Sequence, residues 1–195
     1  MSDLRAALNI SYASVAWSVV AGVLSVGVGL SSSSTALIGT GMDLIADLVS
    51  SVVLVWRFRV ELHGGRPGEE VEHRAHLVAA LALLAVAAGV AAGSIAHLVS
   101  GEGASPTALG LAVSAASVVV LPLLAIGKVR IARAIPSRAL RTDAMITFVG
   151  AATAALSLIG LVLTETLNWT AADPVAALGI AALAAAAGID ELRDR

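Results

Sequence analysis

Six long apolar runs constrain the fold of this chain more than any other feature. A helix needs about 20 apolar residues to cross about 30 Å of hydrocarbon, and 58% of the 195 residues are hydrophobic while only 13% are charged. The runs are continuous rather than alternating, which excludes a strand-built barrel. We therefore expect an all-α membrane protein with one transmembrane domain over residues 1–195, built as a six-helix bundle with helices at about 10–30, 35–57, 75–99, 107–127, 139–163 and 174–189.

The basic residues predict the orientation of this bundle. All twelve Lys and Arg residues lie before the first run, after the last, or between runs two and three and runs four and five, where Lys128 is assigned to the connection. The connections 31–34, 100–106 and 164–173 contain none. Because cytoplasmic loops carry the excess of Lys and Arg, both termini are expected to be cytoplasmic, in a multi-pass protein of the plasma (inner) membrane.

Two aspartates lie near the middle of the second run. Asp43 and Asp47 are four residues apart, so they share one face of a helix, and Thr40, Ser50 and Ser51 extend that polar face. An Asp at the centre of a membrane helix costs about 2.5–3.5 kcal/mol on insertion scales. We favour an ion site over a structural carboxylate pair bonded to neighbouring hydroxyls, because ionisable groups inside membranes usually serve function.

A weak internal repeat relates the second and fifth runs. The segments STALIGTGMD, from Ser34, and SRALRTDAMI, from Ser137, share four identities at an offset of 103 residues. In the orientation above, the second run crosses inward and the fifth outward. The two halves would then form an inverted-topology repeat, an arrangement that places substrate sites near the bilayer midplane.

Four segments carry a resemblance to a known family: SSTALIGTGMDLIADLVSS, RAHLVAAL, ALRTDA and WTAADPVAAL. They resemble the membrane domain of the cation diffusion facilitators, also called the cation efflux family. The resemblance implies a six-helix, proton-coupled exporter of divalent cations, commonly zinc, that is usually a dimer. It also implies a tetrahedral site from two residues of the second helix and two of the fifth, with Asp43 and Asp47 in the second-helix positions.

The chain departs from the family pattern at the fifth helix. Ile146 and Gly150 stand where the family has a His or Asp followed by an Asp, and neither can bind a metal. The helix 5 metal positions are therefore degenerate. Because the sequence ends at Arg195, directly after the sixth run, we expect none of the family's cytoplasmic C-terminal domain.

Oxygen groups near these positions suggest an altered site. Asp143 lies one turn before Ile146, and Thr147 lies one turn beyond Asp143 on the same face. We predict a metal site made by Asp43, Asp47, Asp143 and Thr147 with water. Such a site favours harder ions such as manganese or magnesium, and the substrate is expected to be zinc, manganese, cobalt, iron or magnesium, with no cofactor.

Alternatives remain for several polar residues. Asp143 is equally consistent with an interfacial ion pair to Arg138 or Arg141. Asp173, before Pro174, is predicted to cap the sixth helix. A solvated loop is favoured over a cytoplasmic ion collector for the group His63, Glu69, Glu70, Glu72, His73 and His76.

The expected function follows from the carboxylates. Two close carboxylates in hydrocarbon should hold at least one proton when empty and release it when a metal binds, which couples cation efflux to proton entry. The expected partners are the lipid bilayer, divalent cations, protons and a second copy in a homodimer. A degenerate, non-transporting relative that serves as a partner subunit or structural protein remains the alternative. We find no nucleophile with a base and no phosphate cradle, so no enzyme is expected, and the net charge of −2 suggests no nucleic-acid partner.

Overall fold

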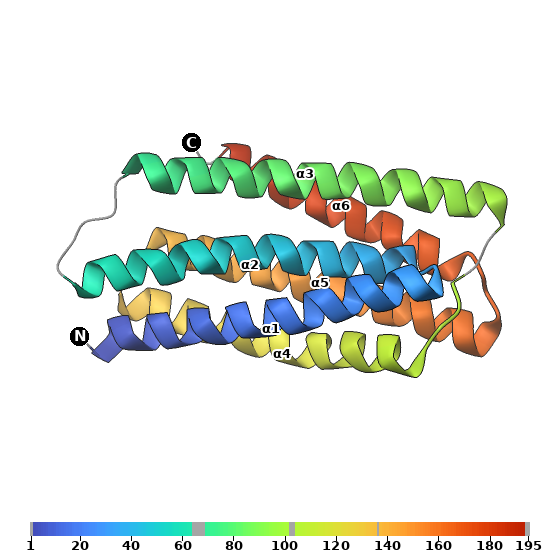
Figure 1. The fold of residues 1–195 in the computed structure, drawn as a ribbon, viewed down its shortest axis with the longest axis horizontal. Helices are drawn as coiled ribbons and strands as arrows, with labels where there is room; N and C mark the ends of the chain where they lie inside the picture. The colour runs from blue at the N-terminus through green and yellow to red at the C-terminus, as the bar shows by residue number, and fades with distance from the viewer. Residues whose placement is uncertain (1, 64–68, 102–103, 136, 194–195) are drawn as a thin grey trace.

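The described part of the chain consists of helices joined by short connections. In a computed structural model, residues 2–63, 69–101, 104–135 and 137–193 are described, apart from the side chains of residues 2, 69–80, 82–83, 86, 138–139 and 191. Within these ranges six helices run antiparallel in sequence order (Figure 1): α1 Ser2–Ser32, α2 Thr35–Leu62, α3 Glu69–Ser100, α4 Ala108–Ala134, α5 Arg138–Leu167 and α6 Ala172–Arg193. The predicted all-helical chain of six helices is confirmed for the described residues.

The helices form two groups. Helices α1 and α2 pack extensively on each other, as do α4 and α5, and contacts of α1 with α4 and of α2 with α5 join these pairs into a four-helix bundle. Helix α3 pairs with α6 along one side of that bundle, where α6 also contacts α5 and α2 (Figure 1). The four helices α1, α2, α4 and α5 therefore share an interior, and the polar residues described below lie there.

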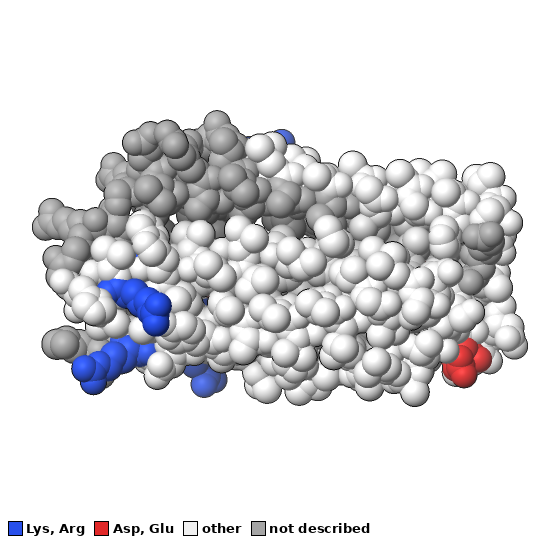
Figure 2. Space-filling model, viewed as in Figure 1, with Lys and Arg blue, Asp and Glu red and all other residues white. Residues whose placement is uncertain are grey.

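Five of the helices meet the length and apolarity needed for a membrane span: Asp3–Ser32, Thr35–Leu62, Ala108–Ala134, Leu140–Leu167 and Ala172–Asp190. In α3 the described residues contribute the apolar segment Ala87–Ser100. Both termini lie at the same end of the molecule (Figure 1), and most of the Lys and Arg side chains visible in Figure 2 lie toward that end. This charge asymmetry fits the predicted orientation, which stays a prediction together with the inverted repeat.

The two serines aligned by the repeat have the same local role. The side chain of Ser34 accepts a hydrogen bond from the backbone N–H of Leu37 at the start of α2, and Ser137 does the same for Leu140 at the start of α5. Both have extended backbone angles, as N-cap residues usually do. The sequence repeat therefore marks two equivalent helix starts.

Close contact between α1 and α2 depends on glycine. A Cβ atom on Gly41 would lie 2.8 Å from the backbone nitrogen of Val26, and one on Gly29 would lie 2.9 Å from that of Ile38. Real Cβ atoms do not approach backbone so closely, so only glycine fits at this separation. The contact brings Ser14 and Ser18 of α1 against Asp47 of α2.

The start of α6 differs from the prediction. Helix α6 begins at Ala172, so Asp173 lies in its first turn rather than capping it. Its carboxylate instead accepts hydrogen bonds from Ser34 Oγ at 2.5 Å, from Thr35 Oγ1 at 3.2 Å and from the backbone N–H of Ala36 at 3.3 Å. Asp173 therefore stabilises the start of α2, where exposed N–H groups and the helix dipole favour a negative charge.

Candidate functional site

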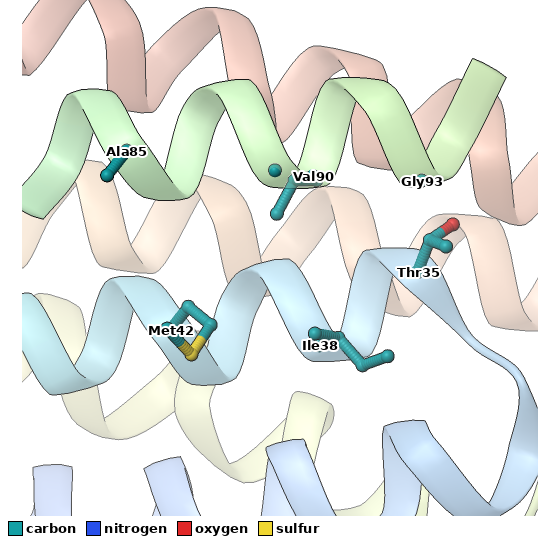
Figure 3. A pocket seen from close by; sticks show the side chains of 7 residues that line it. Thr35, Ile38, Met42, Ala85, Val90 and Gly93 are labelled. Atoms are coloured by element: carbon teal, nitrogen blue, oxygen red, sulfur yellow. The ribbon is translucent and has the colours of Figure 1, made fainter. Parts of the chain in front are cut away.

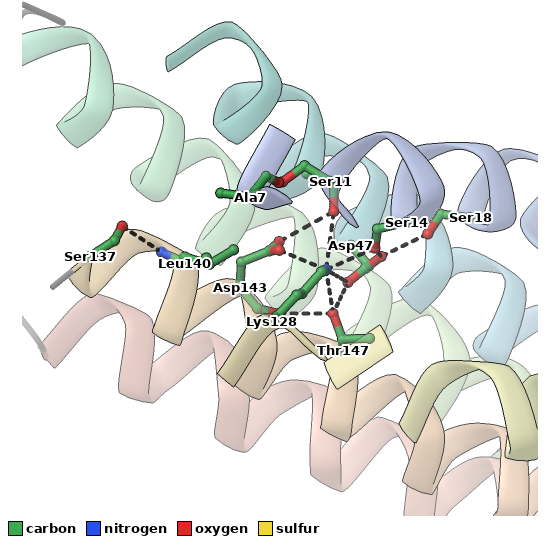
Figure 4. A network of polar contacts seen from close by, with 11 residues as sticks. Ala7, Ser11, Ser14, Ser18, Asp47, Lys128, Ser137, Leu140, Asp143 and Thr147 are labelled. Atoms are coloured by element: carbon green, nitrogen blue, oxygen red, sulfur yellow. Dashed lines mark hydrogen bonds and ion pairs between the residues drawn. The ribbon is translucent and has the colours of Figure 1, made fainter. Parts of the chain in front are cut away.

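A cluster of charged and hydroxyl side chains lies inside the four-helix bundle (Figure 4). Lys128 and Asp143 are fully buried, and Asp47 is 1% exposed. The charged groups come from α4, α5 and α2, and buried serines of α1 complete the cluster. Isolated charges at such depth are too costly to persist unless they are paired and hydrogen-bonded, so their mutual contacts determine what the cluster can do.

Lys128 lies at the centre of this cluster. Its Nζ is 2.6 Å from Asp143 Oδ2, 2.7 Å from Ser14 Oγ and 2.7 Å from Thr147 Oγ1. An ammonium group has three N–H donors, and these three oxygens are enough to satisfy them. Asp47 Oδ1 is farther, at 3.7 Å. The prediction that Lys128 belongs to a connection between helices is wrong, because the residue lies within α4.

Asp47 is held by hydroxyl donors. It accepts hydrogen bonds from Thr147 Oγ1 at 2.6 Å, Ser18 Oγ at 2.7 Å and Ser14 Oγ at 3.2 Å. Ser14 and Thr147 each accept from Lys128 as well, so they bridge the ammonium and the carboxylate. The lysine thus binds Asp143 directly and Asp47 through hydroxyl groups.

Asp143 forms an ion pair, but within the bundle. Besides Lys128 Nζ it contacts Ser51 Oγ at 3.4 Å, and Ser51 also lies 3.3 Å from the ammonium. Arg141, one of the two arginines considered as an interfacial partner, is exposed. The alternative of a surface ion pair for Asp143 therefore gives way to a buried pair with Lys128.

Asp43 lies one helical turn from this network and has a different environment. It is 1% exposed, its Oδ2 accepts a hydrogen bond from Thr153 Oγ1 at 3.1 Å, and its Oδ1 has no hydrogen-bond partner among the described residues. A Cβ atom on Gly150 would lie only 3.2 Å from Oδ2. Because Gly150 has no side chain, the carboxylate of Asp43 occupies the space next to it.

The structure therefore brings together three of the four predicted ligands. Asp47, Asp143 and Thr147 belong to one hydrogen-bonded network, whereas Asp43 lies beside it on α2. In the described ranges, no three His, Cys, Asp or Glu side chains form a set that could hold a metal ion. Metal binding by these residues stays a prediction, and the arrangement shows oxygen groups gathered around a lysine ammonium.

Lys128 and the serines of α1 were not among the predicted site residues, although the sequence contains signals for them. Lys128 is the only lysine in the chain, and it follows an apolar run without a break. It shares the buried face of α4 with Ser114 and Leu121 at seven-residue intervals. On α1, buried serines recur at the same interval, at 11, 18, 25 and 32. A seven-residue spacing keeps residues on one helix face, so both patterns indicated an interior polar stripe.

A second space lies between α2 and α3 (Figure 3). It has a volume of about 560 Å³ and is lined mostly by apolar groups: Thr35, Ile38, Met42, Ala85, Gly89, Val90 and Gly93. Its one hydroxyl, on Thr35, is bonded to Asp173. Because this lining has no carboxylate, it does not suit a cation.

The histidine-containing connection is only partly described. The ring of His63 is exposed, with Nδ1 2.7 Å from the carbonyl oxygen of Arg59. The side chains of His73, His76 and the three nearby glutamates lie outside the described residues. The backbone of these five residues belongs to the first turns of α3, so the expectation of a loop is wrong for them, and their solvation stays a prediction.

Comparison with known proteins identifies the family. A family model described as the cation efflux transmembrane domain matches residues 11–195. The match extends from the first third of α1 through α6 and confirms the resemblance inferred from the sequence segments. No curated protein matches the sequence.

Proposed function

Because the chain belongs to the cation efflux transmembrane domain family, whose members are transporters, we propose that it exports a divalent cation in exchange for protons through the buried cluster. At the level of the family it is a multi-pass membrane protein and a cation transporter. The divalent substrate, the proton coupling and the residues that carry them are the content of the proposal. Lipid surrounds the bundle, and no enzymatic step is assigned.

The observation that carries the proposal is the balance of buried charge. Asp43, Asp47 and Asp143 are three carboxylates in the bundle interior, and Lys128 is the one ammonium among them. When all four are ionised, negative charges exceed positive charges by two. Uncompensated charge inside a membrane protein is costly, and one divalent cation supplies the missing charge. When the cation leaves, protons on the carboxylates restore neutrality, which couples the two movements.

The ligand atoms support the class of ion. The cluster offers carboxylate and hydroxyl oxygens, including Oδ1 of Asp43, to which no described residue donates a hydrogen bond, and the chain contains no cysteine. Oxygen ligands suit manganese and magnesium, whereas zinc prefers nitrogen and sulfur. We therefore propose manganese or magnesium ahead of zinc, cobalt or iron, with Asp43, Asp47, Asp143 and Thr147 as ligands.

Flux through reconstituted protein tests this function. Proteoliposomes with a pH gradient should accumulate Mn²⁺ when they contain the parent protein, and D43N or D47N should abolish uptake while insertion and folding persist. E165Q alters an exposed carboxylate near the outer end of α5 and should transport like the parent. Equal uptake by D43N, D47N and the parent would place the ion path elsewhere.

One observation favours the second candidate, a relative that no longer transports and serves as a partner subunit or structural protein. The three N–H groups of Lys128 already have partners in Asp143, Ser14 and Thr147. The cluster can therefore serve as a structural ion pair that needs no metal ion. Under this alternative, the parent protein moves no divalent cation at any pH gradient.

The proposal includes a homodimer in the plasma (inner) membrane, as the family resemblance implies. Light scattering of purified protein in detergent should give the mass of two chains after correction for bound detergent. A single-chain mass across protein concentrations would remove the dimer from the proposal and leave the flux test unaffected.

A further inference from the structure

We propose that Lys128 is a tethered cation: its ammonium occupies the position between Asp47 and Asp143 where a transported ion would bind, and a divalent cation enters only by displacing it. Lys128 thereby sets the affinity of the site. This inference rests on the proposed function for its ion, but it concerns a residue outside the set of predicted ligands. The family's ligand positions on α2 and α5 do not include it.

The geometry of the ammonium supports this role. Nζ lies 2.6–2.7 Å from three oxygens that come from α5 and α1, namely those of Asp143, Thr147 and Ser14. Ser51 Oγ, from α2, is next at 3.3 Å. A positive centre surrounded by carboxylate and hydroxyl oxygens from three helices is the coordination that a hard metal ion also seeks. The same oxygens cannot serve the ammonium and a metal ion together.

The choice of residue agrees with displacement. The chain has twelve Lys and Arg residues, and the only lysine among them is the one buried in this cluster. An ammonium is a point charge on a flexible four-carbon stem, whereas a guanidinium forms a rigid bidentate fork with a carboxylate. Lysine can therefore leave a carboxylate more easily than arginine can.

The side chain of Lys128 lies close to one end of its helix, toward which it can move. It lies six residues before the end of α4 at Ala134, or about 9 Å along the helix axis at 1.5 Å per residue. Long basic side chains reach toward the membrane interface while their stems stay in apolar surroundings. On arrival of a divalent ion, the stem of Lys128 can turn toward this nearer end and move its charge away from these oxygens. A proton kept on one of the three carboxylates then leaves two negative charges, which the divalent ion balances.

Displacement has a measurable consequence for affinity. An ion that must displace Lys128 loses part of its binding free energy to that exchange, so removing the ammonium should tighten binding. A coupling of this kind between two ligands is typically worth about 5- to 150-fold in affinity. We expect K128M, which keeps a similar stem without the charge, to bind Mn²⁺ at least about tenfold more tightly than the parent. K128R keeps the charge and should show no such gain.

Titration calorimetry of purified parent, K128M and K128R with Mn²⁺ tests this expectation. Equal affinity of the parent and K128M, or no binding by either, overturns the tether. If K128M binds Mn²⁺ more tightly than the parent but the parent transports no Mn²⁺, the displacement of Lys128 is supported and the export function is rejected. If the parent transports Mn²⁺ and K128M binds it no more tightly than the parent, the displacement of Lys128 is rejected and the export function stands.

A second measurement needs no variant, which matters if K128M fails to fold. Because the chain has one lysine, protein labelled with ¹⁵N-lysine has a single side-chain ammonium to observe by NMR. Titration with the diamagnetic ion Mg²⁺ should shift this resonance or broaden it by exchange with water as the ion saturates the protein. If the ammonium resonance is the same in Mg²⁺-saturated protein as in protein without Mg²⁺, Lys128 has kept its partners and the proposal is overturned.

Discussion

The ion pair between Lys128 and Asp143 makes the sharpest prediction about stability. At 2.6 Å from Nζ to Oδ2 and an effective dielectric constant of about 20, Coulomb's law gives an attraction of about 6 kcal/mol. The pair to Asp47, at 3.7 Å, gives about 4.5 kcal/mol by the same formula. Desolvation of the carboxylate offsets part of this gain. Breaking a buried pair on one side costs about 3–5 kcal/mol, because the other charge is left without compensation.

We therefore expect D143N to lower the free energy of unfolding by about 3–5 kcal/mol. For a chain of this length that corresponds to a melting temperature lower by about 6–20 °C. The double variant K128M/D143N removes both charges, and it should recover part of the loss, because replacing a whole buried pair is often neutral. Recovery is partial because Asp47 loses the nearby ammonium and keeps only its hydroxyl donors. Unfolding in mixed detergent micelles, followed by circular dichroism, measures all of these proteins.

The control for this series is E165Q, which neutralises an exposed carboxylate on the same helix and should change stability by less than about 0.5 kcal/mol. Two results would refute the reasoning. One is a D143N protein within 1 kcal/mol of the parent, since the pair would then contribute almost nothing. The other is a K128M/D143N protein no more stable than D143N, since the loss would then not arise from the unpaired ammonium.

Two further predictions concern the packing that positions the cluster. G29A should destabilise the protein by about 1–3 kcal/mol, because the new Cβ would lie 2.9 Å from the backbone nitrogen of Ile38, whereas G27A has nothing within 4 Å and should be tolerated; equal melting temperatures would contradict the close contact of α1 and α2. D173A should cost about 1–3 kcal/mol, since Ser34 and two neighbouring groups lose their acceptor; stability equal to that of E165Q would show that this contact is not needed.

The helical framework was predictable because the apolar runs are long and separated by basic or small polar connections. The bounds were less predictable, since helices continue beyond the hydrophobic runs. Helix α4 shows this most clearly, because its apolar run ends at Gly127 and the helix continues to Ala134. A charge normally marks the edge of a span, and the oxygens supplied by α1, α2 and α5 allow Lys128 to remain inside.

Part of the candidate site was predictable, because polar side chains are conspicuous in apolar helices. Asp47, Asp143 and Thr147 stand out because carboxylates and hydroxyls in apolar helices need partners, and the structure places them in one network. Their common partner could not be read from α2 or α5 alone, since Lys128 comes from another helix. The predicted cap role of Asp173 was wrong for a related reason. Its position before a proline suggested a cap for its own helix, whereas its hydrogen-bond partners lie at the start of α2.

Crystals of the protein grown with Mn²⁺ would locate the bound ion through its anomalous diffraction. We expect an anomalous peak within about 2.0–2.6 Å of carboxylate oxygens of Asp47 and Asp143, with Lys128 Nζ moved away from these oxygens. A peak bound only at the exposed ends of the helices, with Lys128 still paired to Asp143, would contradict this expectation.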